Sequence, residues 1–336
     1  MKTMLVTGGA GFIGSHFVRH ILNTYEDYKV INLDKLTYAG NPENLSDVAD
    51  SPRYEFVTGD ICNAELVNYL MQGVDLVANF AAESHVDRSI MGAEEFMRSN
   101  ALGVYTLLAA AREHEVERFL QVSTDEVYGS LEEDEDPWTE ESPISPRNPY
   151  SVPKAAGDQM ARAFAITYGL PVVITRASNN IGPFQYPEKR VPIYITNALD
   201  DLPLPVYGAG VAIRDHLYVT DHCEAIDLVL HQGVVGEAYN VGSENEADGL
   251  TVAKKILEYL EKPGDLIQHV ADRPGHDMRY AMNATKIQSL GWKPKFDFDE
   301  AMRLTVEWYL GNEAWWRNIR ESASYREYYE KQYSNR

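Results

Sequence analysis

Two short segments of the sequence hold side chains that can transfer protons. Thr124, Asp125 and Glu126 follow the apolar run 118–122, so a hydroxyl and two carboxyl groups stand where a predicted strand ends. Tyr150 and Lys154 are four residues apart, the spacing at which two side chains meet on one helix face. A phenol beside an ammonium can take an alcohol proton, and the two acids can handle a second proton transfer. The residues therefore predict oxidation and elimination at one site, whereas a simple dehydrogenase needs only the phenol and the ammonium.

A glycine-rich turn near the N-terminus predicts a dinucleotide site. Gly8, Gly11 and Gly14 lie between a predicted strand and a predicted helix, where glycines let a pyrophosphate approach backbone N–H groups. Asp34 ends the second predicted strand, at the place where a carboxylate accepts hydrogen bonds from the adenosine ribose and repels a 2′-phosphate. The predicted cofactor is therefore NAD rather than NADP.

Strands alternate with helices through the first half of the chain, which is typical of a parallel sheet covered on both faces. Strands are expected at 3–7, 29–34, 54–58, 76–80, 118–123 and 171–176, and helices at 12–22, 93–114 and 150–168. A further strand, 214–219, and a helix, 221–230, are expected to return to this sheet. The predicted fold is α/β, a doubly wound parallel (Rossmann) sheet with a smaller mixed α/β C-terminal substrate lobe. The expected NAD-binding domain is 1–180 with 213–240, and the expected substrate domain is 181–212 with 241–330.

Composition narrows the class of protein. The chain has 336 residues and a formal charge of −21, which argues against nucleic acid or an anionic membrane surface as a partner. No apolar run approaches the roughly 18–20 residues of a membrane span, and the N-terminus has no signal-peptide pattern, so a cytoplasmic location is expected. Cys62 and Cys223 lack metal-ligand spacing, and no metal is expected. The acidic run 132–141 is expected to be a solvated loop.

From residue 1 to about 316 the chain resembles the dTDP-glucose 4,6-dehydratases, within the extended short-chain dehydrogenase/reductases. Tyr150 and Lys154 match the Tyr-x-x-x-Lys of that superfamily. The other matching strings are 36–41, 81–89, 123–129, 178–180 with 182–183, and 272–277. Related epimerases usually lack both carboxylates after the Ser/Thr pair, so the adjacent Asp125 and Glu126 favour a dehydratase.

The resemblance implies a reaction in three stages on dTDP-glucose. Tyr150 removes the C4 hydroxyl proton as hydride passes from C4 to NAD⁺, and Thr124 holds the same sugar oxygen. Glu126 takes the C5 proton as a carboxylate, while Asp125 in its protonated form donates to the departing C6 hydroxyl. Hydride return to C6 then gives the 4-keto-6-deoxy sugar. The two acids must hold different protonation states, and the charges of Lys154 and the nicotinamide are expected to lower the pKa of Tyr150 from about 10.

The resemblance also implies the binding residues. Those expected at NAD are Gly8, Gly11, Phe12, Ile13, Gly14, Asp34, Lys35, Thr37, Asp60, Ile61, Ala81, Ala82, Glu83, Tyr150, Lys154 and Asn180. Those expected at the nucleotide-sugar are Ser84, Thr124, Asn179, Lys189, Arg190, Pro205, Tyr207, Arg214, Arg273 and His276. Arginine suits a diphosphate because its planar fork donates two parallel hydrogen bonds. Tyr207 is expected either to stack on the nucleobase or to belong to the core.

Two departures from the family pattern bear on the nucleotide. Arg190 stands where a leucine is usual, and Gly249 stands where an asparagine is usual. These positions are expected near the base and the diphosphate, so the choice between dTDP and UDP stays open. The alternatives are a UDP-glucose 4,6-dehydratase, an NDP-sugar 4-epimerase, and a catalytically silent sugar-nucleotide-binding protein. Helices 93–114 and 150–168 resemble the pair through which the family forms a homodimer by a four-helix bundle.

Overall fold

A seven-stranded parallel sheet forms the larger part of the protein. The computed structural model describes residues 1–333. The sheet has the order β10-β6-β5-β4-β1-β2-β3, and every pairing in it is parallel. Its strands are β1 (Lys2–Thr7), β2 (Tyr28–Asp34), β3 (Tyr54–Thr58), β4 (Leu76–Asn79), β5 (Arg118–Thr124), β6 (Val172–Ala177) and β10 (Ala238–Val241). The six predicted strands are thus present within two residues of their expected ends.

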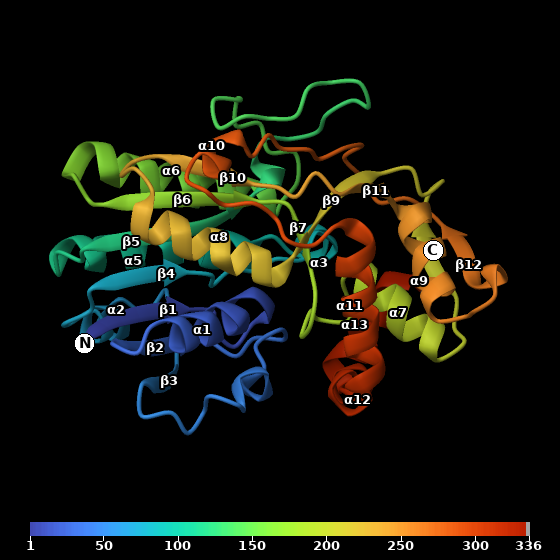
Figure 1. The fold of residues 1–336 in the computed structure, drawn as a ribbon, viewed down its shortest axis with the longest axis horizontal. Coiled ribbons are helices and arrows are strands. Elements are labelled where there is room, and N and C mark those ends of the chain that lie inside the picture. Colours follow the sequence, from blue (N-terminus) through green and yellow to red (C-terminus); the bar gives the residue numbers. More distant parts are fainter. Residues whose placement is uncertain (334–336) are drawn as a thin grey trace.

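Helices cover both faces of this sheet because its strands are apolar on both sides (Figure 1). In β1, Met4 and Val6 face one core cluster and Leu5 faces the other. The first cluster contains α1 (Phe12–Thr24) and α8 (Val219–Gln232). The second contains α2 (Ala64–Leu70), α5 (Val104–Glu113) and α6 (Ser151–Tyr168). The doubly wound α/β prediction is confirmed.

The strand expected at 214–219 was assigned to the wrong sheet. It is β9 (Ile213–Tyr218), which pairs with β7 (Asn179–Ile181) and β11 (Glu246–Asp248) in a separate three-stranded sheet. The edge beside β6 is taken instead by β10, whose Tyr239 and Val241 are buried in the core. Arg214, Asp215 and His216 make β9 too polar for an interior strand of a parallel sheet. The helix of the expected pair, α8, does pack on the large sheet.

The smaller elements gather beyond one end of the large sheet (Figure 1). Here β8 (Leu204–Tyr207) pairs with β12 (Ile267–Val270). Around them lie α7 (Arg190–Leu199), α9 (Gly249–Tyr259), α11 (Phe298–Gly311), α12 (Glu313–Glu321) and α13 (Ala323–Tyr333), which share a third apolar core. The remaining short helices are η1 (Pro42–Leu45), α3 (Val86–Met91), η3 (Asp125–Val127), η4 (Gly264–Leu266) and α10 (Thr285–Gln288). Among residues 1–333, no helix combines the length and apolar character needed to cross a membrane.

The helix expected at 93–114 consists of three pieces. It contains α4 (Glu94–Met97), a π-helical turn, η2 (Arg98–Gly103), and α5. The turn aims Asn100 at the segment after β4, where its side chain exchanges two hydrogen bonds of 2.9 Å with the backbone of Glu83. Gly157 allows α6 and η2 to pack in direct contact, since a Cβ at this position would lie 2.5 Å from the carbonyl oxygen of Asn100. The π turn therefore fixes a loop at the carboxyl end of the sheet, as such turns often do near functional sites.

Candidate active site

The end of β5 holds the hydroxyl and the two acids in one tight turn. Thr124 Oγ1 accepts a hydrogen bond of 3.3 Å from the backbone N–H of Glu126 and donates one of 3.0 Å to Asp125 Oδ1. The turn is the short helix η3, and its two carboxyl side chains are buried, with Asp125 1% and Glu126 8% exposed. Glu126 Oε2 accepts a hydrogen bond of 3.0 Å from the Asn148 amide.

Asp125 is an acid that holds a proton. Burial, followed by the charge of Glu126, raises the pKa of Asp125 to about 8, so this carboxyl keeps its proton at neutral pH. Asp125 Oδ2 is buried and has no hydrogen-bond partner among residues 1–333. Glu126 instead meets a donor, the Asn148 amide. The pair therefore offers a protonated acid, Asp125, beside a second carboxyl group whose Oε2 accepts a hydrogen bond.

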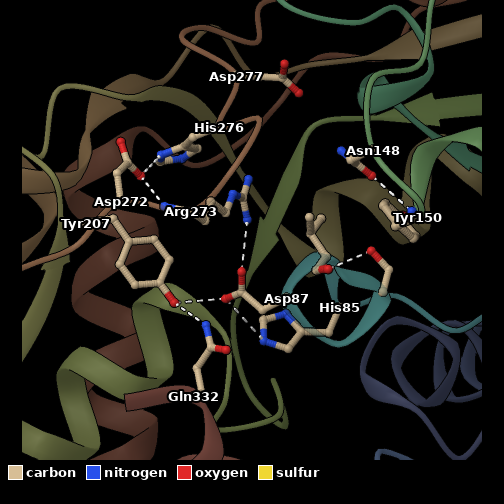
Figure 2. A network of polar contacts seen from close by, with 12 residues as sticks. His85, Asp87, Asn148, Tyr150, Tyr207, Asp272, Arg273, His276, Asp277 and Gln332 are labelled. Carbon is tan, nitrogen blue, oxygen red and sulfur yellow. Dashed lines mark hydrogen bonds and ion pairs between the residues drawn. The ribbon is translucent and has the colours of Figure 1, made fainter. Parts of the chain in front are cut away.

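Asn148 is a site residue that the sequence reasoning missed. Its Oδ1 accepts hydrogen bonds from the backbone N–H groups of Tyr150, at 3.1 Å, and Ser151, at 2.8 Å, so it fixes the start of α6 (Figure 2). Its Nδ2 donates to Glu126. One side chain thus ties the predicted base of the second step to the residue that begins the catalytic helix. The signal in the sequence was an asparagine just before a helix start, where it commonly accepts backbone hydrogen bonds.

The pKa of Tyr150 differs from the expectation. Burial, and next the negative charge of Glu126, raise the pKa of the phenol above its ordinary value. Lys154 Nζ donates to the carbonyl oxygen of Val122 at 2.7 Å, and burial lowers the pKa of this ammonium to about 8. Among the protein's own groups the net shift of the Tyr150 pKa is upward, opposite to the expectation, because desolvation of the phenol is the largest effect.

The glycine turn forms one end of a long cavity. Gly8 has a φ of +71°, and a Cβ there would lie 2.6 Å from the backbone nitrogen of Ala81; a Cβ on Gly14 would lie 2.3 Å from the carbonyl oxygen of Gly8. Asp34 accepts backbone hydrogen bonds from Ala10, at 2.9 Å, and Leu36, at 2.8 Å. All sixteen residues predicted at NAD line this cavity. The side-chain-free turn and the ordered carboxylate fit a dinucleotide.

A second cavity receives the residues predicted for the nucleotide-sugar. It is lined by Ser84, Asn179, Lys189, Arg190, Pro205, Tyr207, Arg214, Arg273 and His276, so that of the predicted set only Thr124 lies in the first cavity instead. Glu126 lines both cavities, which places it at their junction. Asp125 lines neither cavity. Among residues 1–333, no group of three or more His, Cys, Asp or Glu side chains is arranged to hold a metal ion.

The second cavity is rich in guanidinium groups. Arg190 is partly buried, forms no ion pair within residues 1–333, and donates to His216 Nε2 at 3.0 Å. Burial, and next the charge of Arg214, lower the pKa of Arg190 to about 10. Arg214 lies over the ring of Tyr280, 3.9 Å from its centre. Four cations, Lys189, Arg190, Arg214 and Arg273, line this cavity, which suits a diphosphate.

Arg190 and Gly249 depart from the family pattern as a pair. A Cβ on Gly249, at the start of α9, would lie 3.6 Å from Arg190 Nη1 and 3.3 Å from the carbonyl oxygen of Gly210. A longer side chain at 249 would therefore meet the guanidinium. We conclude that the absence of a side chain at Gly249 leaves the space that the Arg190 guanidinium occupies.

Tyr207 lines the second cavity, and its hydroxyl is held in a polar network. The hydroxyl donates to Asp87 Oδ2 at 2.9 Å, and the ring stands edge-on to His276 (Figure 2). Asp272 Oδ1 accepts from the Arg273 backbone at 2.8 Å and from His276 Nδ1 at 2.7 Å. Tyr207 is half-buried and faces this cavity, and its ring also contacts Tyr333 of the third apolar core.

Together the glycine turn, the Tyr150–Lys154 helix and the doubly wound sheet define an extended short-chain dehydrogenase/reductase. Residues 5–305 match the family model described as GDP-mannose 4,6 dehydratase. The chain is 51% identical to the dTDP-glucose 4,6-dehydratase of Neisseria meningitidis, over 95% of this chain and 96% of that protein. It is 49% identical to the low-salt glycan biosynthesis protein Agl12 of Haloferax volcanii, over 92% of this chain and 99% of that protein.

A solved structure agrees with these relatives. DesIV, a dTDP-glucose 4,6-dehydratase from Streptomyces venezuelae with NAD and TYD bound, matches with a TM-score of 0.92 and 47% identity, over 94% of this chain and 99% of that chain. The chain belongs to the dTDP-glucose 4,6-dehydratase family.

Proposed function

We propose that this protein is an NAD-dependent dTDP-glucose 4,6-dehydratase, a lyase that forms dTDP-4-keto-6-deoxyglucose and water. The observation that carries the proposal is the position of Glu126. Its carboxyl lies where the cofactor cavity meets the nucleotide-sugar cavity, next to a second acid, Asp125, that keeps its proton at neutral pH. An epimerase needs no such donor and acceptor pair, because it eliminates no water.

The cofactor cavity supports NAD as the redox partner. Gly8, Gly11 and Gly14 would hold the pyrophosphate against backbone N–H groups, and Asp34 would bind the ribose hydroxyls. When bound, NAD supplies the acceptor for the C4 hydride and the donor for its return to C6.

The chain's own residues then handle the protons. Tyr150 takes the proton of the C4 hydroxyl, and Thr124 Oγ1 holds the same oxygen. Burial raises the pKa of Tyr150 in the protein alone, and the positive charge of a bound nicotinamide would act against that shift, toward the phenolate that can accept the C4 proton. Glu126 accepts the C5 proton, and Asp125 donates to the C6 hydroxyl as water leaves. When hydride returns to C6, Glu126 gives a proton back to C5.

One assay separates this proposal from its alternatives. Purified protein is incubated with dTDP-glucose and, in parallel, with UDP-glucose. A dehydratase gives a 4-keto-6-deoxy product, detected by its absorbance in alkali; a 4-epimerase gives the galactose isomer; a silent binding protein gives neither. A product from UDP-glucose alone would overturn the proposed substrate and leave the reaction class standing.

Arg190 is expected to bind the diphosphate. Replacing Arg190 with leucine should weaken dTDP binding about 10- to 100-fold, since a hydrogen bond to a charged group contributes about 1.5–3 kcal/mol. The double variant Arg190→Leu/Gly249→Asn, which restores the usual family pair, should bind dTDP better than Arg190→Leu alone because the amide occupies the vacated space. Titration calorimetry with dTDP measures both. Unchanged affinity in Arg190→Leu would contradict this role.

Assembly as a homodimer belongs to the same proposal. Leu102 and Tyr105, on η2 and α5, and Val152 and Ile166, on α6, expose large apolar side chains. Paired across a two-fold axis, these helices would form a four-helix bundle that covers them. Light scattering at micromolar concentration should give about 76 kDa, twice the chain mass of 37.9 kDa. An active monomer would refute the dimer.

We also infer two domains and a cytoplasmic location. The cofactor domain comprises residues 1–178 with 219–241, because α8 and β10 belong to the large sheet while β9 does not. The substrate domain comprises the remaining described segments, including β7, β8, α7, α9, α11, α12 and α13, except for α10, whose Ile287 is buried in the core of the cofactor domain. The net charge of −21 supports small-molecule partners rather than nucleic acid or an anionic membrane.

A further inference from the structure

We propose that α13 is a positioning helix for the nucleotide-sugar site. Its buried face holds three separate segments of the cavity wall in the geometry that binds the substrate. The helix lies beyond residue 305, where the match to the family model ends. The inference rests on the proposed function, because it names which part of the chain shapes that site.

The buried face of α13 is polar where a packing helix would be apolar. The buried residues are Tyr325, Tyr328 and Gln332, at positions i, i+3 and i+7, which lie on one helix face. Burying hydroxyl and amide groups costs free energy unless each finds a partner. Each of the three side chains does find one, and every partner belongs to the wall of the substrate cavity or directly adjoins it.

The first segment held by α13 follows β4. Tyr328 Oη lies 2.6 Å from His85 Nε2, and both side chains are buried. The guanidinium of Arg88 is stacked between the rings of Tyr328, at 4.1 Å, and Tyr38, at 3.8 Å. Arg88 Nε also donates to the buried carboxylate of Glu188 at 2.7 Å. One tyrosine thus connects the loop after β4 with the segment that carries Lys189.

The second segment is the one before α7. Tyr325 Oη donates to the carbonyl oxygen of Pro187 at 3.0 Å. Lys189 follows two residues later as the N-cap of α7, with Arg190 as the first helical residue. Both cations line the substrate cavity. The hydrogen bond therefore fixes the backbone from which they project.

The third segment is the end of β8, reached by a directed chain of hydrogen bonds (Figure 2). The Gln332 amide donates to Tyr207 Oη at 2.9 Å, and Tyr207 Oη donates to Asp87 Oδ2, also at 2.9 Å. The other oxygen of Asp87 lies 3.9 Å from Arg273 Nη1. The chain directs the Tyr207 hydroxyl toward Asp87, and Asp87 in turn faces a cation of the diphosphate site. Gln332 acts on the substrate through Tyr207.

Conservative variants test the proposal in the full-length protein. Tyr328→Phe and Gln332→Leu remove the hydrogen-bonding groups and keep most of the packing. Each should raise KM for dTDP-glucose and Kd for dTDP about three- to tenfold, the effect of one lost hydrogen bond. We expect kcat to stay within about twofold, with Tm and bound NAD unchanged. Tyr329→Phe is the matched control on the same helix, because its hydroxyl meets Asn197 at 3.3 Å and not the cavity wall.

A double-mutant cycle then separates positioning from general stability. If Gln332 acts through the Tyr207 hydroxyl, Gln332→Leu should weaken dTDP binding in the wild type and have no further effect in Tyr207→Phe. Additive effects, or variants that bind dTDP as the wild type does, would overturn the inference. So would a parallel fall of Tm, NAD content and kcat, because it would mean that α13 only stabilises the fold. A wild type that fails to bind dTDP would instead overturn the proposed function, and the positioning role with it.

Discussion

Glu126→Gln is expected to lose exchange of the C5 proton while still oxidising C4 slowly. An amide cannot accept a proton, and removal of a positioned general base typically lowers a rate about 10²–10⁴-fold. The surroundings favour one amide orientation in the variant. The Asn148 Nδ2 group donates toward this side chain at 3.0 Å, so the glutamine oxygen would take that hydrogen bond and its NH₂ group would face the other way. A donor would then stand where the reaction needs an acceptor.

Incubation in D₂O distinguishes the C4 oxidation from the transfer of the C5 proton. In D₂O the wild-type product should carry deuterium at C5, measured by mass spectrometry, and the Glu126→Gln variant should return unlabelled substrate together with a little reduced cofactor. Tyr150→Phe should block the earlier oxidation, so it should give neither label nor reduced cofactor. Glu141→Gln, in the exposed acidic loop, is the matched control and should behave as the wild type does. Full rate with full C5 labelling in Glu126→Gln would show that another group is the base.

The sequence predicted six of the seven strands of the large sheet, because each of these six is a short apolar run bounded by turn residues, and it missed β10. The sixteen residues predicted at NAD from the family resemblance line one cavity in the structure, as expected for residues near the carboxyl ends of parallel strands, which meet at one edge of a sheet. The sequence reasoning assigned β9 to the wrong sheet, because pairing partners are set by tertiary contacts rather than by the run itself. The polar Arg214, Asp215 and His216 were the available signal.

Properties that depend on burial were the hardest to predict. Four-residue spacing put Tyr150 beside Lys154 and suggested a lowered pKa, but spacing says nothing about desolvation, which raises it. Asn148 escaped notice because its role depends on two hydrogen bonds at a helix start and a third across the fold. The i, i+3, i+7 pattern of Tyr325, Tyr328 and Gln332 is visible in the sequence. Which cavity that helix face reaches is visible only in the structure.

The expected consequence of Asp125→Asn is a block at the loss of the C6 hydroxyl. Burial and the charge of Glu126 raise the pKa of Asp125 to about 8, so the wild-type side chain carries a proton to donate at neutral pH. Asparagine has nearly the same shape and is a far weaker acid. C4 oxidation and C5 exchange should continue, while turnover falls about 10²–10⁴-fold. Reduced-nicotinamide absorbance should therefore build up during turnover in the variant and stay low in the wild type.

The raised pKa of Asp125 can also be tested independently, through the pH dependence of the free energy of unfolding. An unfolded aspartate has a pKa of about 3.9, so between that pH and about 8 the folded protein binds a proton that the unfolded chain has released. By linkage, this group makes the free energy of unfolding fall as pH rises through that window. When the free energy of unfolding from urea titrations is plotted against pH, Asp125→Asn should lack the part of the slope that this aspartate contributes. Asp136→Asn, on the exposed loop, should keep it. Normal turnover without reduced-cofactor build-up, together with an unchanged slope, would refute both the raised pKa and the acid role. The altered slope with normal turnover would mean that Asp125 holds its proton but another group, such as a water molecule, protonates the leaving hydroxyl.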